Sequence, residues 1–228
     1  RLPPYINIPT KDNVFIPNKL KDLIKKSIIY NDDNFIAINK PNGLAVHGGT
    51  DNKYGVISIM RSIYNQSIDL CHRIDKETSG CLVFSKNKKS SKYFYEQLTA
   101  KKVNKVYRAI LKGRLAKDIE VNIPIGDNHQ SAKSIFKIIK KNQDSTYVEV
   151  KIFTGRTHQI RVHANEIGHP VVNDAKYGDW TYNKRISKKV KRMGLHAYKL
   201  SFTNQDLQEI NLTADIDDSF KDLINVFN

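Results

Sequence analysis

The spacing of apolar residues switches between two periods along the chain, and this switching limits the possible folds. Residues 104–113 and 146–153 alternate between apolar and polar side chains, which predicts strands. Residues 157–168 follow a helical spacing instead, and Gly168 with Pro170 predicts where that helix stops. Strands and helices interleave irregularly, and several neighbouring strands are expected to form hairpins. The pattern predicts an α+β fold with a mixed, mostly antiparallel sheet and flanking helices, not a doubly wound fold.

The other elements are predicted in the same way. Residues 27–41 are expected to form two short strands around an Asn-Asp-Asp-Asn turn, and residues 47–50 a glycine loop. Further strands are predicted at 80–86, 195–204 and 209–214, and helices at 55–64, 90–100 and 219–227, the last capped by Ser219. Residues 1–27 are polar and punctuated by proline, so they are expected to be a lead-in or linker before one main domain, 28–228.

The balance of charge points to a polyanionic partner. Lysine and arginine total 38 against 23 acidic residues, a net charge of +15. The basic residues cluster: 184–192 has six and no acid, and 86–105 has seven lysines and one acid. A charge that serves only solubility is the simpler interpretation. Clustering favours contacts with phosphates, so nucleic acid is the predicted partner.

The sequence lacks the motifs that usually mark several classes of enzyme and membrane protein. The chain has no GxxxxGK[ST], GxGxxG, HExxH or GxSxG, and no apolar run of the roughly 20 residues that span a bilayer. No charged-then-apolar leader opens it, so a cytoplasmic protein without membrane contact is expected. Cys71 and Cys81 are predicted to be buried, reduced thiols. No metal and no cofactor are expected, which leaves the chemistry to side chains.

Three segments place polar side chains between apolar strands: 72–80, 104–110 and 154–163. Each has a structural interpretation, such as a packed His72 or a turn capped by Asp75. Together they suggest more, because a carboxylate can act as nucleophile or general base and an arginine can hold it ionised. A tyrosine can stack on a base taken out of an RNA helix. The set therefore predicts chemistry on a flipped nucleotide.

The segment HRIDKETSG, 72–80, resembles the HRLDxxTSG signature of the RluA-type family of RNA pseudouridine synthases. Its later signatures are matched in order by TGRTHQIRVH (154–163), GHPVVNDAKYG (168–178) and LHAYKLSF (195–202), and its opening by residues 39–49. The HGG…YGV form of residues 47–56 is most like the large-subunit ribosomal RNA enzymes of the RluC type. The resemblance spans about residues 28–214, nearly the whole chain.

This resemblance implies the pseudouridine synthase fold, with a bent sheet and a central catalytic cleft, and the cofactor-independent isomerisation of uridine to pseudouridine in RNA. Asp75 matches the catalytic aspartate, and Arg161 the arginine paired with it. Tyr107 matches the tyrosine that packs on the target base and assists proton removal at C5. Contacts with the RNA or the base are expected from Arg73, His72, Leu195, Arg156 and Lys105. Leu195 would be an apolar wall of the base pocket.

The resemblance leaves the role of Asp75 open between attack on C1′ and removal of a proton at C2′. The Thr-Ser-Gly sequence at 78–80 is expected to form a turn that fixes its direction. Two residues depart from the family's pattern. Ile74 replaces a leucine in the signature, and Asn173 stands where glycine is common.

The predicted substrate is large-subunit ribosomal RNA, the predicted state is a monomer, and a small S4-like RNA-binding module is expected upstream of Arg1. One alternative is a synthase of the same family that acts on tRNA, or on both RNAs. The other is an RNA-binding or ribosome-assembly protein that keeps the fold without catalysis. Substitution of Asp75 separates catalysis from binding.

Overall fold

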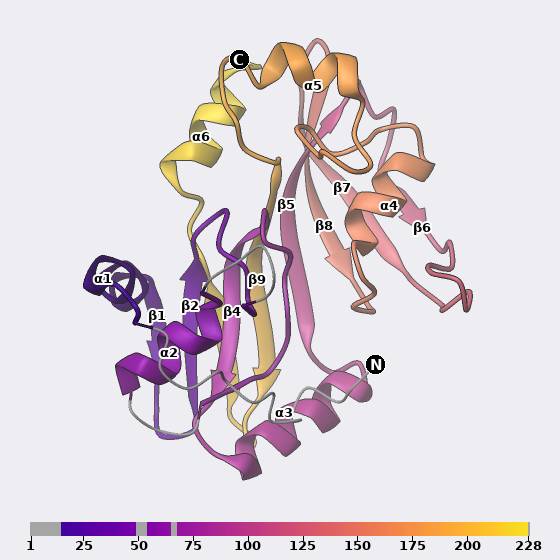
Figure 1. Cartoon of the computed structure of the whole chain (residues 1–228). Coiled ribbons are helices and arrows are strands. Elements are labelled where there is room, and N and C mark those ends of the chain that lie inside the picture. Colours follow the sequence, from indigo (N-terminus) through magenta and orange to yellow (C-terminus); the bar gives the residue numbers. More distant parts are fainter. Residues whose placement is uncertain (1–14, 49–53, 65–67, 228) are drawn as a thin grey trace. The chain divides into compact units, whose positions relative to one another are not determined.

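The computed structural model describes residues 15–48, 54–64 and 68–227, and these fall into two compact units (Figure 1). Unit 1 contains the described residues up to Val103 and Lys199–Ala214; unit 2 contains Asn104–Tyr198 and the residues from Asp215 onward. Strand β9 (Leu195–Thr203) has residues in both. Each unit has its own cluster of buried apolar side chains.

Unit 1 contains β1 (Ile28–Asn31), β2 (Phe35–Lys40), β3 (Asp69–Leu70), β4 (Ser79–Ser85), the second part of β9, and β10 (Glu209–Thr213). The β1–β2, β2–β4, β3–β4 and β9–β10 ladders are antiparallel. The predicted turn between β1 and β2 is made by Asp32, whose Oδ1 accepts the N–H groups of Asn34 and Phe35 at 2.7 and 2.6 Å. The strands predicted around this turn, at 80–86 and at 209–214 are confirmed. Part of the predicted loop at 47–50 lies outside the described residues.

The helices of unit 1 are α1 (Asn18–Lys26), α2 (Val56–Tyr64) and α3 (Lys88–Thr99). Both α2 and α3 were predicted, and Asn87 caps α3 by accepting the N–H of Ser90 at 2.8 Å. Helix α1 was not predicted, since it lies in the stretch expected to be a lead-in. It packs against α2 and buries Ile24 completely. That stretch therefore includes a packed helix before β1.

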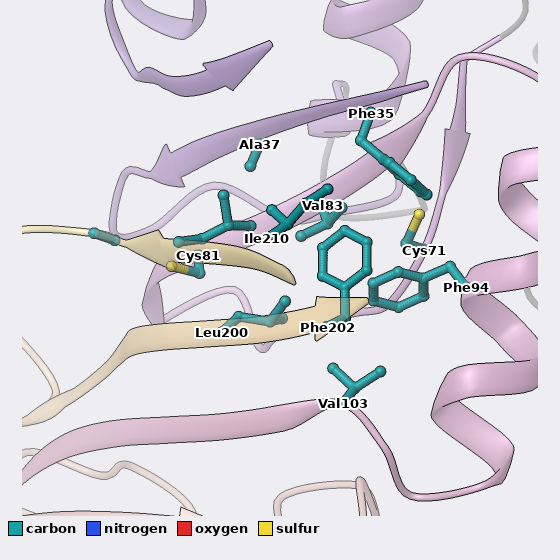
Figure 2. Packing of buried hydrophobic residues seen from close by; sticks show 12 residues of the cluster. Phe35, Ala37, Cys71, Cys81, Val83, Phe94, Val103, Leu200, Phe202 and Ile210 are labelled. Carbon is teal, nitrogen blue, oxygen red and sulfur yellow. The ribbon is translucent and has the colours of Figure 1, made fainter. Parts of the chain in front are cut away.

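The core of unit 1 is built around three phenylalanines (Figure 2). The rings of Phe35 and Phe94 meet the ring of Phe202 edge-on, with centroids 5.0 and 4.9 Å apart. Cys71 and Cys81 lie in the same cluster as buried, free thiols, which confirms the prediction. Burial raises the pKa of the Cys81 thiol to about 12, so its role is packing and not chemistry.

Unit 2 contains β5 (Asn104–Lys112), β6 (Ile119–Val121), β7 (Ser134–Lys141), β8 (Ser145–Ile152) and the first residues of β9. Its strands pair antiparallel in the order β5-β8-β7-β6. Its helices are α4 (Gln159–Glu166), α5 (Trp180–Ile186) and α6 (Asp218–Asn225). Helix α4 ends as predicted, with Gly168 at a φ of 76°.

The cap predicted for the last helix was wrong by two residues. Asp217 caps α6 by accepting the N–H of Phe220 at 2.9 Å. Ser219 lies inside the first turn, where its hydroxyl donates to Asp217 and accepts from Arg192 at 3.0 Å. Aspartate and serine are both good caps, so residue type alone could not choose between them.

Interleaved helices and largely antiparallel strands confirm the α+β class. In the part of the chain that the structure describes, none of the helices has the length and apolar character needed to cross a membrane. The fold places the signature segments at strand ends and turns.

Candidate active site

The signature segment of unit 1 carries Asp75 at the start of a tight turn. The carbonyl of Asp75 accepts the N–H of Thr78 at 3.1 Å, and β4 begins at the next residue. The turn predicted at 78–80 therefore lies earlier, at 75–78, because Ser79 and Gly80 already belong to β4. Gly80 has a φ of 110°, which a residue with a Cβ rarely adopts. The turn fixes the backbone of Asp75 immediately before a fully buried strand.

A buried lysine holds this turn from the other side. Lys40 is fully buried at the end of β2, and its Nζ donates to the carbonyl of Lys76 at 3.0 Å. The same ammonium binds two carbonyls of its own loop, at 3.0 and 2.8 Å. The N–H of Gly43 donates to the Lys76 carbonyl as well, at 3.0 Å. The segment 39–43 thus supports the turn that presents Asp75.

The two neighbours of Asp75 in the signature have different surroundings. His72 packs in unit 1: its ring stacks on Phe94 with centroids 6.2 Å apart, and its Nε2 accepts the N–H of Val83 at 3.1 Å. These contacts favour the structural interpretation of His72. Arg73 is exposed and lies near His47, whose pKa is lowered by burial and then by the Arg73 charge. Arg73 is the better placed of the two to meet an anionic ligand.

In unit 2, Tyr107 and Lys105 lie two residues apart on β5 and share one face of the strand. Both side chains are largely buried, with exposures of 9% and 8%. The Nζ of Lys105 donates to the carbonyl of Thr154 at 3.3 Å. Burial, and to a smaller extent the charge of Arg156, lowers the pKa of Lys105 to about 8. Two of the predicted RNA-contacting residues, Lys105 and Arg156, are thereby brought together.

The loop that carries Arg156 is shaped by the buried side chain of Gln159. Its Oε1 accepts the hydroxyl of Thr154 at 2.6 Å and the N–H of Arg156 at 3.1 Å. Its amide nitrogen donates to the hydroxyl of Ser134 at 3.0 Å. The Arg156 side chain donates from Nε to the carbonyl of Ser131 at 3.1 Å. This network fixes a cationic loop at the start of α4.

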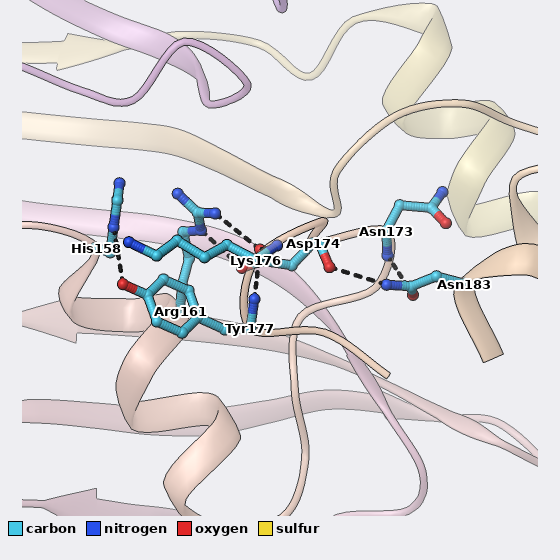
Figure 3. Close-up of polar contacts among 7 residues, drawn as sticks. All are labelled: His158, Arg161, Asn173, Asp174, Lys176, Tyr177 and Asn183. Atoms are coloured by element: carbon cyan, nitrogen blue, oxygen red, sulfur yellow. Dashed lines mark hydrogen bonds and ion pairs between the residues drawn. The ribbon is translucent and has the colours of Figure 1, made fainter. Parts of the chain in front are cut away.

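Arg161 forms a buried, bidentate ion pair with Asp174 (Figure 3). Its Nε and Nη2 donate to the two carboxylate oxygens at 2.7 and 2.8 Å. The Asp174 carboxylate also accepts the N–H groups of Lys176 and Tyr177, at 2.9 and 3.1 Å. Burial raises the pKa of Asp174, but the bonds from Arg161 and from these two N–H groups outweigh it, so the pKa is lowered overall. The guanidinium also lies 5.2 Å from the centre of the Tyr177 ring.

The segment around Asp174 explains a departure from the family's pattern. Asn173 has a φ of 58°, in the left-handed region that glycine adopts freely and asparagine tolerates. Its N–H donates to the side chain of Asn183 at 2.8 Å, and the Asn183 amide donates to the carbonyl of Asp174 at 3.0 Å. Figure 3 shows both bonds. The asparagine therefore keeps the backbone shape that glycine would give.

Leu195 is 3% exposed and opens β9 within unit 2. The predicted site residues divide between the units: His72, Arg73 and Asp75 belong to unit 1, and Lys105, Tyr107, Arg156, Arg161 and Leu195 to unit 2. The pairing of Asp75 with Arg161 and the central cleft stay predictions.

Sequence reasoning missed Asp174 as the partner of Arg161, and Gln159 and Lys40 as supports. Each lies inside a matched signature, which was the available signal. Among the described residues, no group of three or more His, Cys, Asp or Glu side chains could hold a metal ion.

Comparison with known proteins gives a consistent result. A family model described as RNA pseudouridylate synthase matches residues 34–166. Ribosomal large subunit pseudouridine synthase C of Haemophilus ducreyi is 32% identical over 242 residues, covering 97% of this chain and 76% of that protein. Its namesake in Vibrio vulnificus is 34% identical over 223 residues, covering 90% and 70%. The solved structure of human RNA pseudouridylate synthase domain containing 4 has a TM-score of 0.80 at 26% identity, over 91% of this chain and 95% of that chain. The predicted family and fold are confirmed.

Proposed function

This chain belongs to the RNA pseudouridylate synthase family, and we propose that it isomerises specific uridines of large-subunit ribosomal RNA, with Asp75 as the catalytic residue and without a cofactor. The observation that carries the proposal is its similarity, over nearly the whole chain, to proteins named ribosomal large subunit pseudouridine synthase C. The role of Asp75 is supported by its signature and by the turn that Lys40 holds in place.

The reaction needs a positioned carboxylate. The bond between N1 of uracil and C1′ of ribose breaks, a bond between C5 and C1′ forms, and the hydrogen on C5 leaves as a proton. The ionised Asp75 either attacks C1′ or takes the proton at C2′, and in both routes it is restored when the new bond has formed. A closed pocket keeps the detached uracil beside C1′, so the base turns instead of diffusing away.

The residues of unit 2 would serve the base and the acid. Tyr107 would pack on the uracil and assist removal of the C5 proton. Arg161 would pair with Asp75 and hold its carboxylate in one orientation. Its pair with Asp174 engages Nε and Nη2, and a guanidinium, with five N–H donors, can bind two carboxylates at once. Asp174 is then a positioning residue, because it sets the direction of Arg161.

The RNA backbone would be bound by cations around this set. Lys105 and Arg156 lie together at the loop before α4, and Arg73 lies exposed beside Asp75 in the sequence. These positions suit contacts with the phosphates that flank a flipped nucleotide. Leu195 would form an apolar wall of the base pocket, in keeping with its burial.

The test is the release of tritium from uridine C5 in unmodified large-subunit ribosomal RNA. The wild-type protein should release it, and Asp75→Asn should lower release by at least about 100-fold while RNA affinity changes little. Glu77→Gln is a matched control, since it removes an exposed carboxylate from the same turn. It should leave release nearly unchanged.

The other outcomes would each overturn part of the proposal. Release from tRNA but not from ribosomal RNA would show that the proposed target is wrong and would favour the tRNA alternative. Binding without release from either RNA would favour a non-catalytic binder. Equal loss in Asp75→Asn and Glu77→Gln would show that the charge of the turn matters and that Asp75 has no special role.

A further inference from the structure

The chain's single tryptophan stands on the surface of unit 2. Trp180 is the first residue of α5, and 74% of its surface is exposed. One exposed apolar side chain needs no functional explanation by itself. Trp180 is unusual because a cation lies against it: the Nζ of Lys184, one helical turn later, is 5.0 Å from the ring centre. The two side chains form one aromatic and cationic surface.

This surface is held on a firmly anchored helix. Asp179 caps α5 by accepting the N–H of Tyr182 at 2.7 Å, and its carboxylate also pairs with Lys112. Arg185 pairs with Asp144, and the last residue of the helix, Ile186, is buried. A helix fixed at both ends loses little conformational freedom when a ligand stacks on it.

The basic cluster of residues 184–192 divides into two kinds of side chain. Arg185 and Arg192 are engaged in ion pairs, and Arg192 is only 3% exposed; that the cluster contacts phosphates stays a prediction. Lys188, Lys189 and Lys191 are exposed and have no ion pair with another described residue. With Lys184, which lies against Trp180, they give four exposed cations on α5 and in the residues that follow it.

We propose that Trp180 and these four lysines form an accessory RNA contact that binds an unpaired stretch of the substrate. A base stacks on the exposed ring of Trp180 and Lys184 binds a phosphate next to that base, while the three lysines after α5 bind phosphates farther along the strand. Stacking on an aromatic ring combined with a cationic surface is the general way that single strands are bound without regard to sequence. Duplex RNA offers the lysines its phosphates but no free base face.

This inference rests on the proposed function only in taking RNA as the partner. None of its residues belongs to the set predicted to act on uridine. It extends the proposed function because the RNA substrate would need, besides the target uridine, an unpaired segment that binds outside the catalytic residues. Binding at α5 can therefore be measured without any turnover.

Trp180 reports on its own contact, because the chain has no other tryptophan. The fluorescence of the Asp75→Asn protein should be quenched by a single-stranded oligouridylate of twelve nucleotides and much less by a blunt duplex of equal length. Asp75→Asn removes catalysis from the measurement, so the result does not depend on whether the proposed reaction occurs. Equal quenching by strand and duplex, or no quenching, would overturn the stacking contact.

Variants measured by filter binding of the same oligonucleotide give the second test. Trp180→Ala should weaken binding about 10-fold, and Trp180→Phe should restore most of it, since phenylalanine keeps a stacking face. Thr181→Ala is the matched control, because it changes the exposed neighbour on the same helix. Unchanged affinity in Trp180→Ala, or equal losses in Trp180→Ala and Thr181→Ala, would overturn the proposal.

Discussion

Lys105 holds its proton less firmly than an exposed lysine does. Its side chain is 8% exposed, its ammonium has a carbonyl partner in Thr154, and Arg156 lies close enough to repel it. Burial and this repulsion both favour the neutral amine, which is why the pKa falls to about 8. An RNA phosphate would place a negative charge beside this ammonium.

The affinity for RNA should therefore depend on pH through Lys105. Between pH 7 and 9 the charged fraction falls from about nine-tenths to about one-tenth, given a pKa of about 8. If the charged form binds a phosphate, affinity should weaken by up to about tenfold over that range. Filter binding at fixed ionic strength measures this. Lys105→Met should bind more weakly at pH 7 and show no such decline.

Stability gives an independent check with the opposite sign. The folded pKa of Lys105 lies below its ordinary value, so between about 8 and 10.5 the unfolded chain binds more protons. The free energy of unfolding of the wild type, relative to Lys105→Met, should rise across this window, by roughly 3 kcal/mol. A flat difference would mean that Lys105 is not a buried cation, and a pH-dependent affinity would then need another source.

Single residues were predicted where a signature names them. Asp75 lies at a tight turn, although that turn begins three residues earlier than predicted, and Tyr107 lies on a strand as expected. The supports were beyond sequence reasoning, because the partner of Lys40 is a carbonyl 36 residues away. Neither the type of a residue nor its spacing in the sequence predicts a hydrogen bond to a distant main-chain carbonyl.

At the level of elements, the segment after α4 binds that helix through one ion pair. Asp174 and Arg161 are 0% and 8% exposed as side chains, so removing the carboxylate takes a charged partner from a buried guanidinium. Removing one partner of a buried pair costs about 3–5 kcal/mol. The link between α4 and this segment should therefore decide both stability and the direction of Arg161.

Asp174→Asn should lower the free energy of unfolding by about 3 kcal/mol, as measured by urea denaturation at pH 7. Because the pKa of Asp174 is lowered in the fold, the effect is present above the ordinary carboxyl pKa and fades as pH falls below it. Where the variant is still folded, kcat should fall while RNA affinity stays close to the wild-type value. A loss of affinity without loss of kcat would contradict a positioning role.

The exposed pair of Asp218 and Lys221 supplies the control for Asp174. Asp218→Asn makes the same chemical change at a position in water, where ion pairs contribute little. It should leave the free energy of unfolding and kcat near their wild-type values. Matching losses in the two variants would show that the effect comes from net charge and not from the buried pair.

Long, strongly periodic elements such as β5, β8 and α3 were predicted, and weaker ones were not. Helix α5 has only seven residues and depends on Asp179 and on ion pairs with β5 and Asp144, none of which shows in its own sequence. Strand β7 buries Ser134 and exposes several lysines, so its apolar alternation is weak. Packing and long-range pairs decided these elements.

At the scale of the molecule, only some of the basic side chains that give the positive net charge are available to RNA. Ion pairs inside unit 2 engage Arg161, Arg185 and Arg192, which sequence alone counts with the free cations. The sequence predicted RNA as the partner, in agreement with the family. Which basic side chains remain exposed, however, depends on acidic residues far away in the chain. Among the exposed lysines of the described residues, two groups fall in the clusters predicted to contact phosphates, one in each unit.

These two groups should act on RNA binding through counterion release. The group on α3, Lys88, Lys89 and Lys92, belongs to unit 1, and the group after α5, Lys188, Lys189 and Lys191, belongs to unit 2. Each phosphate contact adds about −0.7 to the slope of log affinity against log salt on a single strand, and about −0.9 on double-stranded B-DNA. The wild-type slope on structured ribosomal RNA should be steep.

Replacing all three lysines of one group with alanine should flatten that slope by about 2 if each contacts a phosphate. The two triple variants serve as controls for each other, since both remove three charges from a chain of net charge +15. Filter binding between about 50 and 300 mM salt gives the slopes. A slope that changes in one variant alone assigns the RNA path to that unit, because a general effect of net charge would move both equally. If neither slope changes, neither group contacts phosphates, and the contacts are made by other cations of the chain.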